Sequence, residues 1–286
     1  MKLAIASLLA VPALALAQVA DPQPDELLQI AFPKWKDEEG GRAQSIPTSA
    51  ATRGWNAKQG KKRNVIVVPR QAVRVAPDRI VLLATLVPAG DSGDPQVAHG
   101  TPVGLAAYTF KPGKDGWKVA RRQEPFDLQG YEGRAQMALV PLPGTSQALQ
   151  VTWGSCWQGR CADAFALYAI GGDGVKAKPL LRQKIKGNNL YSRPDCVERL
   201  NAIMQGLQPA DPAYADEKVP PGLCYAIEGR WDIGSAGALT LRFAGAMSKA
   251  GKGGNAPAQR IDQAMKFEFR GGRYVPVSGS NPVPDA

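Results

Sequence analysis

The chain has 286 residues with 35 basic and 25 acidic side chains, which gives a formal net charge of +10 at neutral pH. Its 31 glycines and 24 prolines favour many turns over long helices and therefore indicate β architecture. A single histidine excludes metal sites that are built from several histidines.

The first residues have the three parts of a secretory signal peptide. Lys2 supplies the positive charge, an apolar stretch runs from Leu3 to Leu16, and Ala15 and Ala17 are the small residues that a signal peptidase reads. A membrane anchor or a buried helix is disfavoured, because spanning a bilayer takes roughly 20 residues and Pro12 interrupts the stretch. We therefore expect cleavage after Ala17 and a soluble periplasmic or secreted protein without a transmembrane segment.

The region after the signal peptide carries most of the excess positive charge. Without the signal, 34 basic and 25 acidic residues remain, a net charge of +9. Between Gly40 and Arg74 no acidic residue interrupts eight basic ones: Arg42, Arg53, Lys58, Lys61, Lys62, Arg63, Arg70 and Arg74. We divide the chain into a signal peptide (1–17), a basic, loop-rich N-terminal segment (18–63) and a disulfide-stapled β domain (64–286).

The first predicted element after the signal is a short helix from Asp25 to Phe32, which Pro33 ends. Residues from Trp35 to Asn64 lack periodicity and are rich in Gly, Ser, Thr and Lys, so we expect a long loop or a partly ordered arm. Ordered β structure is expected to begin at Val65.

A module of strand, loop, strand, Gly-rich turn and strand then occurs three times. Each alternating apolar strand meets a turn in which glycine supplies a positive φ, a pattern typical of β-hairpins. The copies begin at Arg79, Ala148 and Ala238. The predicted fold is therefore mainly β: repeated hairpins that form a sandwich or a partial propeller-like array, with one short amphipathic helix pinned by a disulfide.

That helix is predicted to begin at Asp195, where Glu198 completes a pattern like a capping box, and to end near Gly206. Its apolar residues recur on one face at helical spacing: Val197, Leu200, Ile203, Met204 and Leu207. We expect this face to pack on the core.

The four cysteines fit an oxidising compartment and allow three pairings. We favour Cys156 with Cys161, because the residues between them form a predicted tight turn, which leaves Cys196 with Cys224. A bridge of this kind typically contributes about 2–4 kcal/mol. The alternatives, a zinc site or a redox pair, favour closer spacings such as C-x-x-C, which do not occur.

Catalytic motifs are mostly missing. His99 is expected to hydrogen-bond locally, and Ser92, in a Gly-Asp-Ser-Gly-Asp-Pro stretch that resembles the nucleophile motif of chymotrypsin-like proteases, has no histidine upstream to act as base. Four carboxylates near aromatic or Gly-rich segments leave open an alternative function, a carboxylate-dependent hydrolase of envelope glycans: Glu132, Asp163, Glu228 and Asp232. We predict no catalytic residue, metal or cofactor, and favour a non-enzymatic protein.

The basic stretch is the best functional signal, because cations beside aromatic rings suit polyanions. The predicted ligand contacts are Arg53, Trp55, Lys58, Lys61, Lys62 and Arg63. The expected partner is an anionic envelope polymer or an acidic protein, and no nucleic acid in vivo. A second basic set, Arg182, Lys184 and Lys186, is interpreted as the charged edge of a strand.

A segment of the chain resembles uncharacterised exported proteins of Gram-negative bacteria. The segment from His99 to Pro102, the strand from Gly104 to Phe110 and the stretch from Asp115 to Val119 are similar to their H-x-x-P segment, strand and G-x-W hairpin. Those proteins have Cys beside the His, where this chain has Ala98 and Gly100. The resemblance implies an envelope location and β-hairpins, and no activity.

Overall fold

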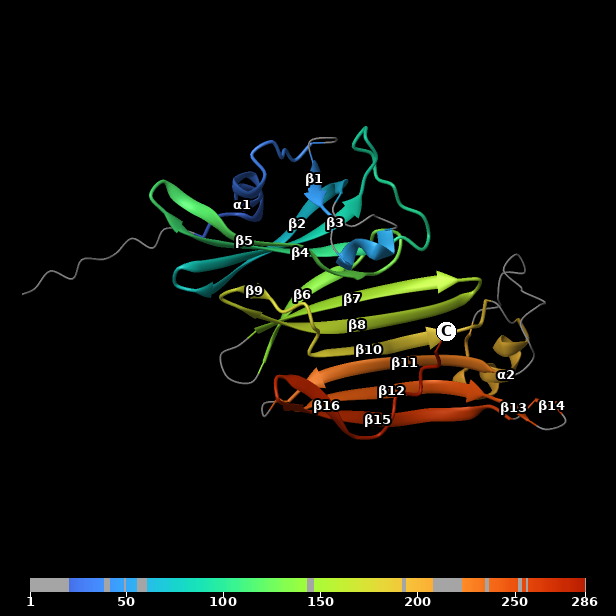
Figure 1. Ribbon diagram of the computed structural model, residues 1–286. Helices are drawn as coiled ribbons and strands as arrows, with labels where there is room; N and C mark the ends of the chain where they lie inside the picture. The colour runs from blue at the N-terminus through green and yellow to red at the C-terminus, as the bar shows by residue number, and fades with distance from the viewer. Residues whose placement is uncertain are drawn as a thin grey trace, which may run out of the picture.

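Two antiparallel sheets lie one on the other in the computed structural model (Figure 1). The predicted signal peptide lies outside the described residues, which are 21–38, 42–48, 50–55, 61–142, 147–191, 194–207, 223–234, 237–251, 254–255 and 257–285. Within these residues, no helix is both long enough and apolar enough to cross a bilayer.

The upper sheet has five strands in the order β1-β2-β3-β4-β5. They are β1 (Ala43–Pro47), β2 (Lys62–Ala76), β3 (Arg79–Pro88), β4 (Val103–Gly113) and β5 (Gly116–Gln129). The middle strands β3 and β4 are apolar on both faces, because both faces are covered. Leu82 packs under the N-terminal elements, whereas Leu83 packs against the lower sheet.

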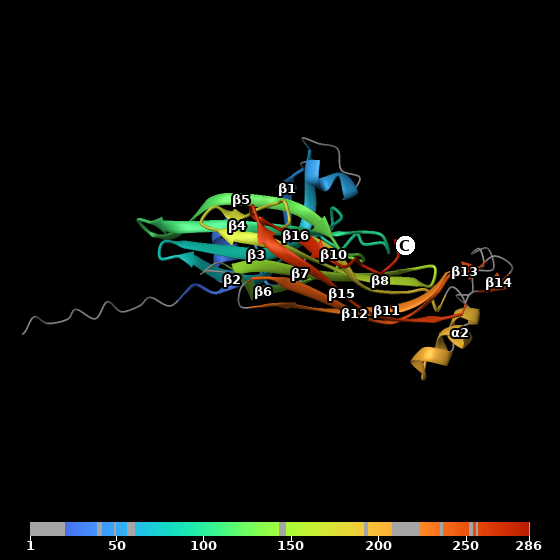
Figure 2. The same cartoon turned by 90° about the horizontal axis from the view of Figure 1, so that it is seen from below.

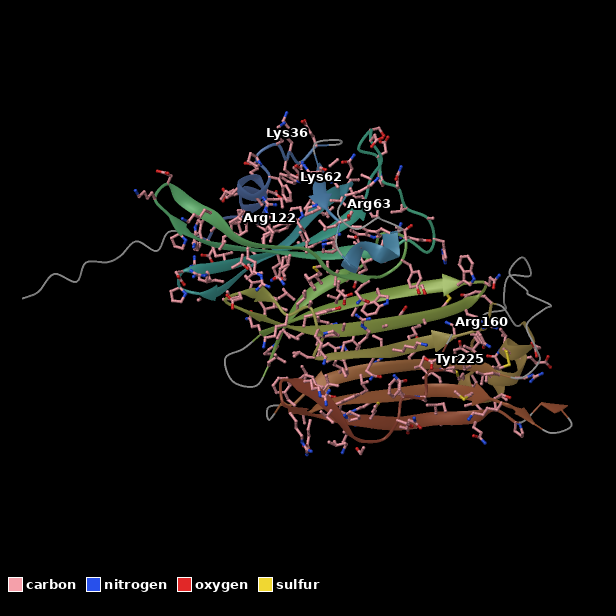
Figure 3. The ribbon with its side chains drawn as sticks, in the orientation of Figure 1. Lys36, Lys62, Arg63, Arg122, Arg160 and Tyr225 are labelled. Carbon is pink, nitrogen blue, oxygen red and sulfur yellow. A yellow bond between two sulfur atoms is a disulfide. The ribbon has the colours of Figure 1, made fainter. Side chains whose placement is uncertain are left out.

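The N-terminal elements form the outer cover of the upper sheet. Helix α1 (Pro24–Ala31) confirms the predicted first helix, and the 3-10 helix η1 (Ala50–Trp55) follows β1. Arg122 of β5 donates a hydrogen bond to the carbonyl oxygen of Ala31, and its guanidinium lies 4.7 Å from the centre of the Phe32 ring (Figure 3). These contacts anchor α1 on the sheet.

The expected arm from Trp35 to Asn64 differs from the structure. Strand β1 pairs with the start of β2, so ordered β structure begins before Val65. Trp35 is buried and donates its indole N–H to the carbonyl oxygen of Val67. The described part of this segment belongs to the core because its two tryptophans need an apolar environment that only the sheet provides.

The lower sheet has nine strands and curls into a half-barrel. They are β6 (Gln136–Pro141), β7 (Gln147–Trp157), β8 (Arg160–Gly171), β9 (Gly174–Val175), β10 (Leu181–Asn188), β11 (Cys224–Ile233), β12 (Leu239–Ser248), β15 (Gln259–Arg270) and β16 (Arg273–Ser278). A short pair, β13 (Ala250–Gly251) and β14 (Gly254–Asn255), is separate. Figure 2 shows the strands of both sheets along the long axis of the molecule.

The two faces of the lower sheet have different partners. Leu149 and Tyr168 face the upper sheet, and Phe165 and Leu167 belong to the separate core of the half-barrel. This division follows from the period of two along a strand, which sends neighbouring side chains to opposite faces.

The three predicted modules are hairpin sets in the structure. They correspond to β3-β4-β5, β7-β8-β9 and β12-β15-β16, whose successive strands are antiparallel neighbours. The last two strands of each set meet at a glycine with positive φ: Gly116, Gly174 and Gly271. The sequence pattern therefore predicts the mainly β fold correctly.

A partly buried polar cluster joins the sheets. Oδ2 of Asp127 on β5 accepts hydrogen bonds from the Tyr168 hydroxyl at 2.7 Å, from Arg182 at 2.7 Å and from Gln129 at 2.8 Å. Burial raises the pKa of Tyr168, so this hydroxyl stays protonated and acts as a donor.

The interpretation of Arg182, Lys184 and Lys186 as a strand edge is wrong, because β10 lies between β8 and β11. A bulge also interrupts their alternation between Lys184 and Lys186. Each of the three has an acidic partner: Asp127, Asp285 and Glu228 respectively.

Both predicted disulfides, Cys156–Cys161 and Cys196–Cys224, are present. The second ties helix α2 (Pro194–Met204) to the first residue of β11, at one end of the molecule (Figure 2). Helix α2 already contains Asp195 in its first turn, where it pairs with Arg199 at 2.9 Å, so the predicted start is one residue late. Leu200 packs on the sheet, as the apolar face predicts.

Candidate ligand-binding sites

Trp55 is not at the surface. Its side chain is 4% exposed, and its Nε1 donates a hydrogen bond to the carbonyl oxygen of Pro102 at 2.8 Å. A Cβ on Gly104 would lie 2.7 Å from the indole ring, so the absence of a side chain there makes room for it. A ring held in this way has no free face for a ligand, so the prediction of Trp55 as a ligand contact is wrong.

Three consecutive cations remain from the predicted basic site, and we name Lys61, Lys62 and Arg63 the basic cluster. Both lysines are exposed at the start of β2. Arg63 donates from Nη1 to the carbonyl oxygen of Trp55 at 2.7 Å, and its guanidinium lies 5.9 Å from the centre of the Trp55 ring. Figure 3 shows Lys62 and Arg63 on the upper sheet.

The side chains of the other two predicted contacts, Arg53 and Lys58, cannot be placed relative to the basic cluster. The backbone of Arg53 is part of η1, and its side chain lies outside the described residues, as does the whole of Lys58. The basic cluster therefore consists of the three described cations at the start of β2.

Each of the four candidate carboxylates lies near a lysine, an arginine or the His99 imidazole. Asp232 is 3.8 Å from Arg242, and Glu132 is 3.0 Å from the His99 ring nitrogen Nδ1. Lys186 lies 2.8 Å from Glu228, and its pKa is raised first by this hydrogen bond and also by the nearby charge of Asp163. Three cavities of about 700, 570 and 610 Å³ lie among the described residues, and only the second is lined by one of the four, Asp163.

The third of these cavities is an apolar hollow at the α2 end of the lower sheet, and we name it the aromatic hollow. It is lined by His99, Cys156, Trp157, Gln158, Gly159, Cys161 and Tyr191. Trp157 and Tyr191 are 60% and 44% exposed, and the hollow brings these two exposed rings together. The ring centres of His99 and Trp157 are 5.1 Å apart, with the planes tilted by 38°.

The position of Trp157 follows from the turn between β7 and β8. Gln158 and Gly159, with φ of 48° and 73°, form the two-residue loop that right-twisted hairpins favour. The disulfide Cys156–Cys161 closes the same turn one pair of residues further back. Trp157 therefore stands on a rigid hairpin end.

The position of His99 follows from a contact between two loops. The amide N–H of Gly133 donates to the carbonyl oxygen of Thr101 at 3.0 Å, which brings the segments before β4 and after β5 together. Glu132, in the second loop, then holds the His99 ring nitrogen Nδ1. The structure therefore differs from the expected local hydrogen bond, because His99 bonds to a carboxylate 33 residues away in sequence.

Sequence reasoning missed the aromatic hollow. The residues Trp157 to Arg160 were sufficient to predict a turn, and a large ring inside a disulfide-closed turn was the available signal. A tryptophan in a tight loop of this kind has few neighbours to bury it, which is why it remains exposed.

A cluster of Asp195 with Cys196 and Cys224 has the spacing of metal ligands, within 4.8 Å. Because both sulfurs are joined in a disulfide, neither is a thiolate that a metal could bind.

No protein-family model, curated protein sequence or solved structure matches the chain.

Proposed function

We propose that the chain is an exported, periplasmic and non-enzymatic binding module that recognises an anionic component of the bacterial envelope. The observation that carries this proposal is the basic cluster, because no carboxylate of the described residues lies within 4 Å of its three cationic groups. Three other arginines in the N-terminal part of the chain each pair with an aspartate: Arg42, Arg74 and Arg79.

Uncompensated neighbouring cations create a local positive potential that favours a negatively charged partner. Arg63 contributes a guanidinium whose orientation is already fixed by Trp55, so little side-chain freedom is lost when an anion binds. The two exposed lysines that precede it in sequence act as mobile point charges. A phosphate or carboxylate group of an envelope polymer fits this combination.

Export is supported by two features. The N-terminal pattern of Lys2, the apolar stretch and Ala17 is typical of a signal peptide. The two disulfides agree with an oxidising compartment. The four carboxylates give no comparable support to glycan hydrolysis, since none of the three cavities described above is lined by two of them.

Replacing Lys61 and Lys62 with glutamine is expected to weaken binding to immobilised lipopolysaccharide by about five- to thirtyfold, if each lysine contributes about 0.5–1 kcal/mol. The slope of log affinity against log salt should also decrease, by about two if the lysines release counterions as phosphate-bound cations do. Biolayer interferometry at several salt concentrations measures both quantities.

The matched control is Lys114→Gln with Lys118→Gln, which removes the same charge from two exposed lysines at the β4–β5 hairpin. Binding by this variant should stay within about twofold of the unchanged protein. If both double variants lose affinity equally, binding depends on net charge and not on the basic cluster, and the proposal fails. It also fails if neither loses affinity.

A further inference from the structure

The aromatic hollow has properties that the basic cluster does not explain. None of its seven lining residues is lysine or arginine: Arg160 lies between the lining residues Gly159 and Cys161 but does not itself line the hollow, and the carboxylate of Glu132 bonds to His99. The lining therefore offers an anion no lysine or arginine. It does not favour the anionic group that suits Lys61 and Lys62.

The exposed apolar surface is too small for a stable protein partner. An aromatic side chain buries about 150–250 Å² in total, so Trp157 and Tyr191 at 60% and 44% exposure offer at most about 250 Å² together. A specific protein interface buries about 800 Å² on each side. The cavity volume of about 610 Å³ lies instead in the range of small-molecule sites.

The polar groups at the margin of the hollow define the chemistry further. Gln158 is exposed in the turn and offers an amide, and Tyr191 carries a hydroxyl. The side chain of Glu132 is 47% exposed, so it keeps acceptor sites beyond its contact with His99. The ligand thus needs a flat apolar face for the indole and a polar edge that donates and accepts hydrogen bonds.

A pyranose ring has both parts, because its C–H groups form an apolar face and its hydroxyls surround the edge. We propose that the aromatic hollow binds a sugar ring of a neutral glycan, which stacks on Trp157 while its hydroxyls bond to Gln158 and Tyr191. This proposal does not depend on the basic cluster. It assigns the module a second ligand class at a second site.

Preorganisation strengthens this assignment. The disulfide and the turn hold Trp157, and the contact with Glu132 holds His99 against it. A platform that is rigid before binding loses little conformational entropy when the ligand arrives. Exposing a fixed indole to water has no benefit for folding, since burial of the same ring would be favourable.

The test is a titration of the full mature protein with maltohexaose, laminarihexaose, cellohexaose and the tetrasaccharide of N-acetylglucosamine, followed by tryptophan fluorescence and calorimetry. At least one glycan is expected to bind saturably with a Kd on the order of 1 mM or below. Trp157→Ala should weaken that binding by about tenfold or more, and Tyr191→Ala by less. Trp157→Phe should retain part of the affinity, because a ring remains.

Phe269→Ala is the matched control, because Phe269 is an exposed aromatic residue (38%) that lines a different cavity. It should leave glycan binding unchanged, as should Lys61→Gln with Lys62→Gln. The proposal is overturned if no glycan of the panel binds up to about 10 mM. It is also overturned if the Trp157→Ala protein is folded by near-ultraviolet circular dichroism and binds the glycan normally. Binding of choline without binding of any glycan would overturn it as well, because the rings would then recognise a quaternary ammonium cation.

Discussion

Replacement of Trp55 with alanine is expected to lower the free energy of unfolding by about 3–5 kcal/mol, the usual cost of truncating a buried tryptophan. The ring fills the space above Gly104 and contributes to the core that α1 and η1 form with the upper sheet. Its loss also leaves the carbonyl oxygen of Pro102 without the indole donor. Urea denaturation followed by far-ultraviolet circular dichroism measures the change.

Trp157→Ala is the control for this experiment, because the same residue type is removed from a side chain that is 60% exposed. Its effect on stability should remain within about 0.5 kcal/mol. A Trp55→Ala protein of normal stability that no longer bound lipopolysaccharide would contradict the burial argument and would return Trp55 to the ligand contacts.

The contrast between these two tryptophans shows which information the sequence contains. Hairpins depend on neighbouring residues, so alternating apolar strands and glycine turns were sufficient to predict them, and the short span from Cys156 to Cys161 indicated a disulfide within one turn. The helix around Leu200 was predictable for the same reason, since its apolar face repeats within eleven residues.

Burial depends on partners that lie far away along the chain. Trp55 lies between basic residues in a sequence without periodicity, and only its contact with Pro102, 47 residues later, shows that it belongs to a core. The order of strands is non-local in the same way. Nothing near Arg182 in the sequence indicates that β10 lies between β8 and β11. The alternating charges of β10 therefore predict an edge strand, whereas the structure places β10 inside the sheet.

Only one part of the aromatic hollow, Trp157 in its disulfide-closed hairpin, had a signal in the sequence, and the assembly of the hollow did not, for a related reason. Its rings come from three segments: His99 from the loop before β4, Trp157 from the end of β7 and Tyr191 from the connection that follows β10. Each residue alone has an ordinary explanation in the sequence. Only the stacking of the two sheets places the loop with His99 against the hairpin with Trp157.

Removal of the disulfide Cys196–Cys224, by Cys196→Ala with Cys224→Ala, is expected to lower the free energy of unfolding by about 3.6 kcal/mol. This value is the chain-entropy estimate for a closed loop of 28 residues. Helix α2 has eleven residues, a length that is marginal without tertiary contacts, so its helical signal should weaken first. Hydrogen exchange of the α2 amides, measured with global urea unfolding, tests both expectations.

Alanine is the appropriate replacement, because both sulfurs are fully buried beside Leu200 and a serine hydroxyl would need a new partner there. Cys156→Ala with Cys161→Ala is the matched control, since its sequence separation of 5 gives only about 2 kcal/mol by the same relation. If the short bridge proves to stabilise the protein more than the long one, restriction of the unfolded chain is not the source of the stability. The rigidity of the folded β7–β8 turn would then be the better explanation.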